Sequence, residues 1–164
     1  MSRKLHNILI TGGAGFIGSN FIHYLFGMSS AEGNLFDDAN FDGTVVNVDC
    51  LTYAGNLESL KDIEEKFGGK RYFFEKVDIC DRENIERIFK QYDIDTVIHF
   101  AAESHVDRSI LGPEAFMKTN VMGTFTLLDV ARNYWKKEDG SIRDDVLFHH
   151  ISTDEVYGSL GETG

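Results

Sequence analysis

Residues 7–18 read NILITGGAGFIG, and this stretch decides the fold. A strand-like run is followed by a glycine-rich turn and then by the start of a helical apolar pattern. Glycines let the backbone turn tightly and approach a pyrophosphate, and the free N–H groups at a helix N-terminus attract the anion. Because a strand precedes the glycines and a helix follows them, the stretch predicts a dinucleotide-binding turn rather than an unliganded loop.

The rest of the chain alternates strand-like and helix-like segments. Strands are expected at 7–11, 44–49, 71–78, 96–101 and 146–152, and helices at 16–26, 57–67, 82–92 and 113–135. Such alternation is typical of parallel strands joined by right-handed crossovers, and near-continuous apolar strands fit a sheet covered on both faces. The predicted fold class is therefore α/β, a Rossmann-type doubly wound parallel sheet with helices on both faces.

The composition limits the classes of partner. The chain has 164 residues, 42% of them hydrophobic, and a net charge of −11. Its length fits about one domain, no apolar run is long enough to span a membrane, and the acidic balance argues against a nucleic-acid partner. Residues 27–43 are rich in Gly, Asp, Asn and Ser and are expected to form a surface loop.

Cysteine and histidine usage suggests neither a disulfide framework nor a metal site. Cys50 and Cys80 are too few for a framework and are expected to be reduced, buried thiols in a cytoplasmic protein. His149 and His150 are adjacent in a predicted strand, so their side chains are expected on opposite faces, and no metal site is predicted.

Two aspartates end neighbouring strand-like runs. Asp49 ends the second run, where a carboxylate accepts hydrogen bonds from the adenosine ribose and repels a 2′-phosphate, so NAD is favoured over NADP. It lies 31 residues beyond Gly18 instead of about 20, and the 27–43 segment absorbs the difference. Asp78 ends the third run, where it either faces the adenine or is an ordinary strand-end cap.

Several longer blocks carry a family resemblance. They are TGGAGFIG (11–18), NVDCLTYAGNLESL (47–60), VDICD (77–81), FAAESHVDRSI (100–110), TNVMGT (119–124), ARNYW (131–135) and HHISTDEVYG (149–158). Together they resemble the dTDP-glucose 4,6-dehydratase family of the extended short-chain dehydrogenase/reductase superfamily. The resemblance implies a lyase that uses NAD to convert dTDP-glucose into dTDP-4-keto-6-deoxyglucose, in deoxysugar (rhamnose-type) synthesis for polysaccharides.

The same resemblance implies a role for individual residues. The NAD pyrophosphate would be held by the turn, the adenosine ribose and the adenine by the two strand ends, and the nicotinamide half by the block from 100 to 104. For the pyrophosphate these are Gly12, Gly13, Gly15, Phe16, Ile17 and Gly18, and for the adenosine ribose Asp49, Leu51 and Thr52. For the adenine they are Asp78 and Ile79, and for the nicotinamide half Phe100, Ala101, Ala102, Ser104 and Thr119.

The segment after the last strand would carry the chemistry. By resemblance, Thr153 hydrogen-bonds the hexose, Asp154 is the acid for the leaving C6 hydroxyl, Glu155 is the base for the C5 proton, and Ser104 also reaches the sugar nucleotide. Sugar-nucleotide epimerases of the same fold have small residues at these two acidic positions, which favours dehydration. Without the resemblance, an Asp-Glu pair at a strand end is more often a solvated loop or a helix start.

The family's Tyr-x-x-x-Lys helix and its substrate-binding C-terminal region do not follow in these 164 residues. Tyr72 and Lys76 match the spacing, but they lie in a predicted strand, so the match is rejected. Residues 1–164 are therefore expected to be an incomplete NAD-binding Rossmann domain that is inactive alone and belongs to a homodimer when complete. The alternatives are another sugar-nucleotide dehydratase or epimerase, or a non-catalytic NAD-binding module.

Overall fold

The computed structural model describes residues 5–27, 41–105 and 112–153, together with 156, 158 and 161. They contain a five-stranded sheet with the order β3-β2-β1-β4-β5, in which every neighbouring pair is parallel. The strands are β1 (Asn7–Thr11), β2 (Thr44–Val48), β3 (Tyr72–Glu75), β4 (Thr96–His99) and β5 (Leu147–His150). Thr11 is paired with Val48 on one side and with His99 on the other, so the central strands end at one edge.

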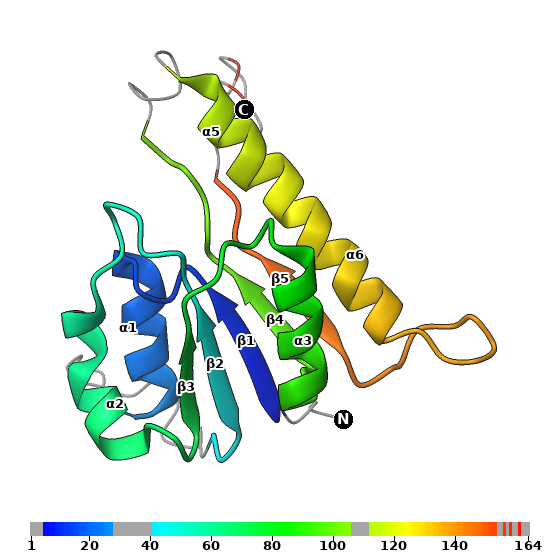
Figure 1. Ribbon diagram of the computed structural model, residues 1–164, viewed down its shortest axis with the longest axis horizontal. Helices are drawn as coiled ribbons and strands as arrows, with labels where there is room; N and C mark the ends of the chain where they lie inside the picture. The colour runs from blue at the N-terminus through cyan, green and yellow to red at the C-terminus, as the bar shows by residue number, and fades with distance from the viewer. Residues whose placement is uncertain are drawn as a thin grey trace.

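The connections between the strands are helical. They are α1 (Phe16–Leu25), the 3₁₀ turn η1 (Leu57–Leu60), α2 (Lys61–Phe67), α3 (Arg82–Tyr92), α5 (Pro113–Phe116), the π-helical segment η2 (Met117–Gly123) and α6 (Thr124–Tyr134). The last three follow one another without a break and form the long helix that rises beyond the sheet in Figure 1. Asp81 caps α3 by accepting a hydrogen bond from the N–H of Asn84, as its position before the helix predicts.

Each face of the sheet has its own apolar core. On one face, Val46 and Val97 pack with Ile88 of α3 and Leu127 of α6. The other face is covered by α1 and by the η1–α2 segment, through residues that include Ile22, Leu60 and Ile63. Figure 1 shows the two pairs of helices on opposite sides of the strands. The predicted doubly wound parallel sheet is therefore confirmed.

Two expectations about detail were wrong, and a third is made more specific. The third strand ends at Glu75 instead of residue 78, because Asp78 turns the chain by accepting a hydrogen bond from the N–H of Cys80. The long helix was expected to bury part of the face that carries Phe116, Val121, Phe125, Leu128 and Ala131 or Arg132. Ala131 is buried, together with Leu127, while Phe125 and Leu128 are exposed. Apolar residues occupy both sides of this helix, so their spacing did not indicate which side is buried.

The second correction concerns the two thiols. Cys50 is exposed and Cys80 is half-buried, because both lie in turns that follow strands and not inside a strand. Both are free, as expected. Most of the 27–43 segment lies outside the described residues.

Within the described ranges, the structure contains no helix that is long and apolar enough to cross a membrane. The same residues contain no group of three or more His, Cys, Asp or Glu side chains that could hold a metal ion.

Candidate cofactor site

The glycine-rich turn joins three elements at the carboxyl edge of the sheet. Gly12 has a φ of +70°, and its N–H donates to the carbonyl of Val48 at 2.9 Å. A Cβ on Gly12 would lie 2.8 Å from the backbone N and Cα of Ala101, and one on Gly18 would collide with the carbonyl oxygen of Gly12. Side chains at these two positions would therefore push the end of β4 and the start of α1 away from the turn.

The N-terminus of α1 is prepared for an anion. Its N-cap is Gly15, no side chain caps it, and no acidic residue stands in its first turn. The first N–H groups of a helix have no partner within the helix, and the helix dipole adds positive potential at that end. Phe16 and Ile17, in this first turn, are exposed. The end of α1 therefore offers backbone donors next to the turn, which is the chemistry that a pyrophosphate needs.

Asp49 ties the turn to the end of β2. Its carboxylate accepts hydrogen bonds from the N–H groups of Ala14 at 3.0 Å and Leu51 at 2.8 Å. Each carboxylate oxygen has a second lone pair, so Asp49 can still accept from a ribose hydroxyl. Leu51 has a φ of +55°, a strained value for a residue with a side chain, and such strain is common at functional sites.

Asp78 holds a similar place after β3. One of its oxygens accepts from the N–H of Cys80 at 2.9 Å and the other lies 2.9 Å from the ammonium nitrogen of Lys118. Burial alone would raise the pKa of Asp78, but the hydrogen bonds from Cys80 and Lys118 outweigh it and the pKa is lowered. The pKa of the Cys50 thiol is raised by burial and by the charges of Asp49 and Asp78. The carboxylates at the two strand ends thus act on one small region.

A buried histidine connects the turn with the long helix. His99 Nδ1 lies 2.6 Å from the hydroxyl oxygen of Thr11, and Nε2 lies 2.9 Å from that of Thr124. The Thr11 hydroxyl also accepts a hydrogen bond from the N–H of Ala101 at 3.3 Å, so Thr11 links the ring to the backbone that follows β4. Burial and the nearby His150 lower the pKa of His99 to about 4. Sequence reasoning missed His99, although a polar residue within an apolar strand was its signal.

A second missed residue holds the block from 100 to 104 against the helix. Asn120, in η2, accepts a hydrogen bond from the N–H of Glu103 at 2.8 Å and donates one to its carbonyl oxygen at 2.9 Å. The amide therefore pairs with Glu103 as a neighbouring strand would. π-Helical segments often occur at functional sites, and this one places Thr119 and Asn120 at the edge of the site.

These elements enclose a pocket of about 530 Å³, a size typical of ligand sites. The structure brings most of the predicted cofactor residues together in its lining, namely Gly12, Gly15, Phe16, Ile17, Gly18, Asp49, Thr52, Asp78, Ile79, Phe100, Ala101, Ala102, Ser104 and Thr119. Gly13 and Leu51 are not in the lining but lie within the turns that shape it. Thr153 is exposed and also outside the lining, and the predicted acid and base, Asp154 and Glu155, lie outside the described residues.

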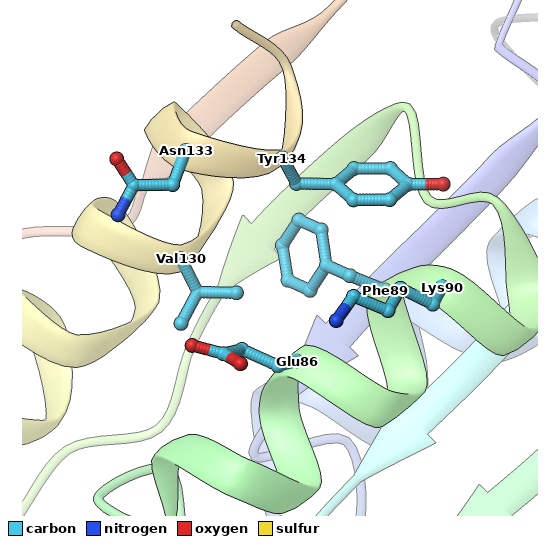
Figure 2. A pocket seen from close by; sticks show the side chains of 6 residues that line it. All are labelled: Glu86, Phe89, Lys90, Val130, Asn133 and Tyr134. Atoms are coloured by element: carbon cyan, nitrogen blue, oxygen red, sulfur yellow. The ribbon is translucent and has the colours of Figure 1, made fainter.

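A smaller hollow of about 300 Å³ lies between α3 and α6 (Figure 2). In Figure 2, Phe89 and Lys90 of α3 face Val130 and Tyr134 of α6. The Phe89 and Tyr134 rings meet edge to face at 5.6 Å. This hollow contains neither a glycine turn nor the end of a strand, so we place the cofactor site at the carboxyl edge of the sheet.

Known proteins resemble the chain over nearly all of its length. Residues 9–164 match the family model described as GDP-mannose 4,6 dehydratase. The dTDP-glucose 4,6-dehydratase of Salmonella typhimurium is 56% identical over 153 residues, which make up 93% of this chain and 38% of that protein. A crystal structure of dTDP-glucose 4,6-dehydratase from Bacillus anthracis in complex with NAD gives a TM-score of 0.72 at 39% identity, and covers 97% of this chain and 41% of that one.

A UDP-glucose-4-epimerase from Stenotrophomonas maltophila with bound NAD gives a TM-score of 0.70 at 28% identity, and covers 94% of this chain and 39% of that one. The chain thus spans about two fifths of the length of the relatives that it matches. Because the family match begins within β1 and takes in the glycine turn, both strand-end carboxylates and the helix beside the pocket, the chain belongs to the GDP-mannose 4,6 dehydratase family.

Proposed function

We propose that the pocket binds NAD. The observation that carries the proposal is the uncapped N-terminus of α1 beside a turn that excludes side chains at Gly12 and Gly18. Gly12, Gly15 and the first turn of α1 would hold the pyrophosphate, and Asp49 would accept from the adenosine ribose. Asp78 and Ile79 would border the adenine, and the block from 100 to 104 with Thr119 would hold the nicotinamide half.

We further propose that the protein dehydrates dTDP-glucose to dTDP-4-keto-6-deoxyglucose. The relatives from Salmonella typhimurium and Bacillus anthracis are dTDP-glucose 4,6-dehydratases, and the chain is 56% identical to the first. Bound NAD would supply a reversible hydride acceptor, which oxidises the sugar at C4 and later reduces it at C6. A C4 ketone acidifies the C5 hydrogen, so one base and one acid suffice to remove water across C5–C6.

The acid and the base are assigned by resemblance to the dehydratases. Thr153 would hydrogen-bond the hexose, Asp154 would protonate the leaving C6 hydroxyl and Glu155 would take the C5 proton. An acid at neutral pH must keep its proton, which a second carboxylate next to it favours. Ser104 lines the pocket and would reach the sugar nucleotide.

Two further proposals concern the assembly. Met117, Val121 and Phe125 are exposed and follow one another at four-residue intervals along the long helix, which suits contact with a second copy. We also propose that residues 1–164 alone do not turn over, since no Tyr-x-x-x-Lys follows the segment at 149–158 within them. Tyr72, the residue with matching spacing, does not line the pocket: it is buried, and its hydroxyl oxygen accepts a hydrogen bond from the side-chain amide of Asn47 inside the core.

The second candidate is a sugar-nucleotide epimerase. The epimerase from Stenotrophomonas maltophila has nearly the same backbone, with a TM-score of 0.70. An epimerase returns the hydride to C4 and needs no acid for a leaving hydroxyl. The adjacent acidic residues Asp154 and Glu155 favour the dehydratase.

Two measurements test these proposals in sequence. Calorimetric titration with NAD should give saturable binding, and Asp49→Ala should weaken it about tenfold or more through the lost ribose contact and the loosened turn. Mass spectrometry of incubations of the complete protein with dTDP-glucose, GDP-mannose and UDP-glucose then reads out the reaction, and turnover by residues 1–164 alone would contradict their proposed inactivity. Loss of one water from dTDP-glucose supports the dehydratase, and an unchanged mass with an isomeric product supports the epimerase. Absence of NAD binding would contradict the proposed site itself.

A further inference from the structure

The adenosine end of the pocket combines two carboxylates with one ammonium group. Asp49 directly follows β2, and Asp78 lies three residues beyond the end of β3. These strands are hydrogen-bonded neighbours, and neighbouring strands lie about 4.8 Å apart. Among the described residues that line the pocket, Lys118 of η2 is the one with a positive charge. A charged ligand group at this end would therefore interact with Asp49, Asp78 and Lys118 together.

Asp78 already holds that ammonium group. The Lys118 nitrogen lies 2.9 Å from one Asp78 oxygen, while the other oxygen accepts from the N–H of Cys80. The carboxylate is thus fixed by the backbone on one side, and the lysine is drawn to it on the other. The Lys118 side chain is 64% exposed, so the pocket wall does not prevent it from swinging to another anion nearby.

We propose that Asp78 helps the pocket to select NAD over NADP by keeping Lys118 away from the 2′ position of the adenosine ribose. This inference rests on the proposed NAD site. A carboxylate at the end of the second strand faces the ribose hydroxyls, and a cation close by is what accommodates a 2′-phosphate. Asp49 would repel that phosphate. Asp78 binds the Lys118 ammonium group, which would otherwise offset the repulsion.

Lys118 lines the same pocket as Asp49, Cys50 and Asp78. Its pKa is raised first by the hydrogen bond and the charge of Asp78, and also by the thiols of Cys80 and Cys50. Cys50 is the residue next to Asp49, and its own pKa is raised by burial and by both aspartates. The ammonium group therefore shares this end of the pocket with the residues that follow β2.

The test is a double-mutant cycle on cofactor preference. NADH and NADPH affinities are measured by fluorescence titration at low ionic strength for the wild type, Asp78→Asn, Lys118→Met and the double variant. Asparagine keeps the size of Asp78 and its acceptor for the Cys80 N–H, but not the charge. We expect Asp78→Asn to raise the NADPH-to-NADH affinity ratio about fivefold, the range of an exposed ion pair. Lys118→Met should remove that gain, and alone should change the ratio less than about twofold.

Three results would overturn the inference. The first is an unchanged ratio in Asp78→Asn. The second is an equal gain in Asp78→Asn and in the double variant, which would assign the effect to lost repulsion and not to Lys118. The third is a large fall of the ratio in Lys118→Met alone, which would mean that the lysine is already free in the wild type. Failure of the wild type to bind NADH would instead overturn the proposed function, and the inference with it.

A second route leaves Asp78 intact in case Asp78→Asn does not fold. Asp49→Asn is compared with Asp49→Asn combined with Lys118→Met. If Asp78 occupies Lys118, the loss of the lysine leaves the ratio of the Asp49→Asn protein within about twofold. A drop of about fivefold or more would show Lys118 acting on the 2′-phosphate with Asp78 still in place, and would contradict the inference.

Discussion

The two edges of the sheet are built in opposite ways. At the carboxyl edge, glycines leave space and the backbone is held by the small side chains of Thr11 and Asp49. At the amino edge, aromatic rings fill the space around Arg71, the residue before β3. Its guanidinium carbon lies 5.2, 5.6 and 5.7 Å from the ring centroids of Phe26, Phe41 and Phe67.

Hydrogen bonds complete the amino edge. The Arg71 guanidinium donates to the carbonyl oxygens of Gly43, at 3.0 Å, and Phe41. The rings of Phe26 and Phe67 stack at 4.4 Å. One side chain thus fastens the end of α1, the start of β2 and the start of β3 together. We therefore expect substitutions at the amino edge to lower the stability of the fold, and substitutions at the carboxyl edge to weaken cofactor binding.

The sharpest test of this contrast is Gly12→Ala at the carboxyl edge. The new Cβ would require a positive φ in alanine and would meet the backbone of Ala101 at 2.8 Å. Because backbone cannot rotate aside, the turn must move, and we expect NAD affinity to fall by about thirtyfold or more. The free energy of unfolding should fall by about 2 kcal/mol. Calorimetric titration and urea unfolding measure the two effects.

Gly69→Ala is the matched control, since Gly69 lies in the turn just before β3. It also has a positive φ, +67°, but its Cβ would meet nothing within 4 Å. It carries the backbone strain without the collision, so we expect a loss of about 1 kcal/mol in stability and an unchanged NAD affinity. If Gly69→Ala weakened NAD binding as much as Gly12→Ala, the assignment of the two edges would be wrong.

Arg71→Met tests the amino edge in the opposite sense. Methionine keeps much of the apolar stem but loses the carbonyl hydrogen bonds and the attraction of the three rings. We expect the free energy of unfolding to fall by about 2–3 kcal/mol, with NAD affinity within about twofold of the wild type. Arg132→Met is the control, because Arg132 is 68% exposed and pairs with Asp129 one turn away; it should cost less than about 1 kcal/mol. Equal losses in the free energy of unfolding would mean that the Arg71 contacts stabilise the fold no more than the exposed pair of Arg132 does.

The contrast between the edges also explains what sequence reasoning could reach. The carboxyl edge was predictable because its parts are local: the glycine turn is one stretch, and Asp49 and Asp78 each follow a strand within three residues. The parallel sheet then brings these ends together without further information. Most of the predicted cofactor residues consequently line one pocket.

The amino edge was not predictable because its partners are scattered. Phe26, Phe41 and Phe67 come from three separate segments, and nothing in their spacing points to Arg71. The buried side of the long helix was not predictable for a different reason. Apolar residues lie on both of its sides, and the π-helical segment at 117–123 departs from a 3.6-residue repeat. The role of His99 was not predictable because its hydrogen-bond partners, Thr11 and Thr124, lie on other elements of the fold.

His99 should make stability depend on pH. The folded pKa of about 4 lies below the ordinary value of 6.5, because the ring is buried and His150 is near. Between pH 6.5 and 4, His99 therefore binds a proton in the unfolded chain but not in the folded protein. The contribution is complete above pH 6.5 and is lost as the pH falls toward 4, by about 3 kcal/mol in all. Urea unfolding between pH 4.5 and 8 should show this loss in the wild type and a shallower slope in His99→Gln.

The range from pH 7 to 8 provides the internal control for that experiment. His99 is neutral in both states there, so the difference between wild type and His99→Gln should stay constant. If the two proteins lost stability in parallel below pH 6.5 as well, the burial of a neutral His99 would not be the cause of the acid sensitivity.

The smallest effect is expected at a contact that belongs to neither edge. His23 of α1 places Nε2 2.9 Å from the carboxylate of Asp62 in α2, and Nδ1 2.9 Å from the carbonyl oxygen of Ser19. Burial would raise the pKa of Asp62, but the hydrogen bond and charge of His23 and the N–H of Ile63 outweigh it and lower the pKa. The carboxylate thus stabilises the fold above its ordinary pKa of 3.8, and the contribution disappears as the pH falls through the lowered value.

The size of this contribution is limited by solvent, because the Asp62 side chain is 48% exposed. We expect Asp62→Asn to cost about 0.5 kcal/mol at pH 6, less in 1 M salt, and nothing once the pH is well below the lowered pKa of Asp62. Since the pair joins two helices on one face of the sheet, the NAD affinity and the Arg71 contacts should not change. A loss as large as that of Arg71→Met would mean that the docking of α2 on α1, and not the aromatic packing at the amino edge, governs the stability of this half of the molecule.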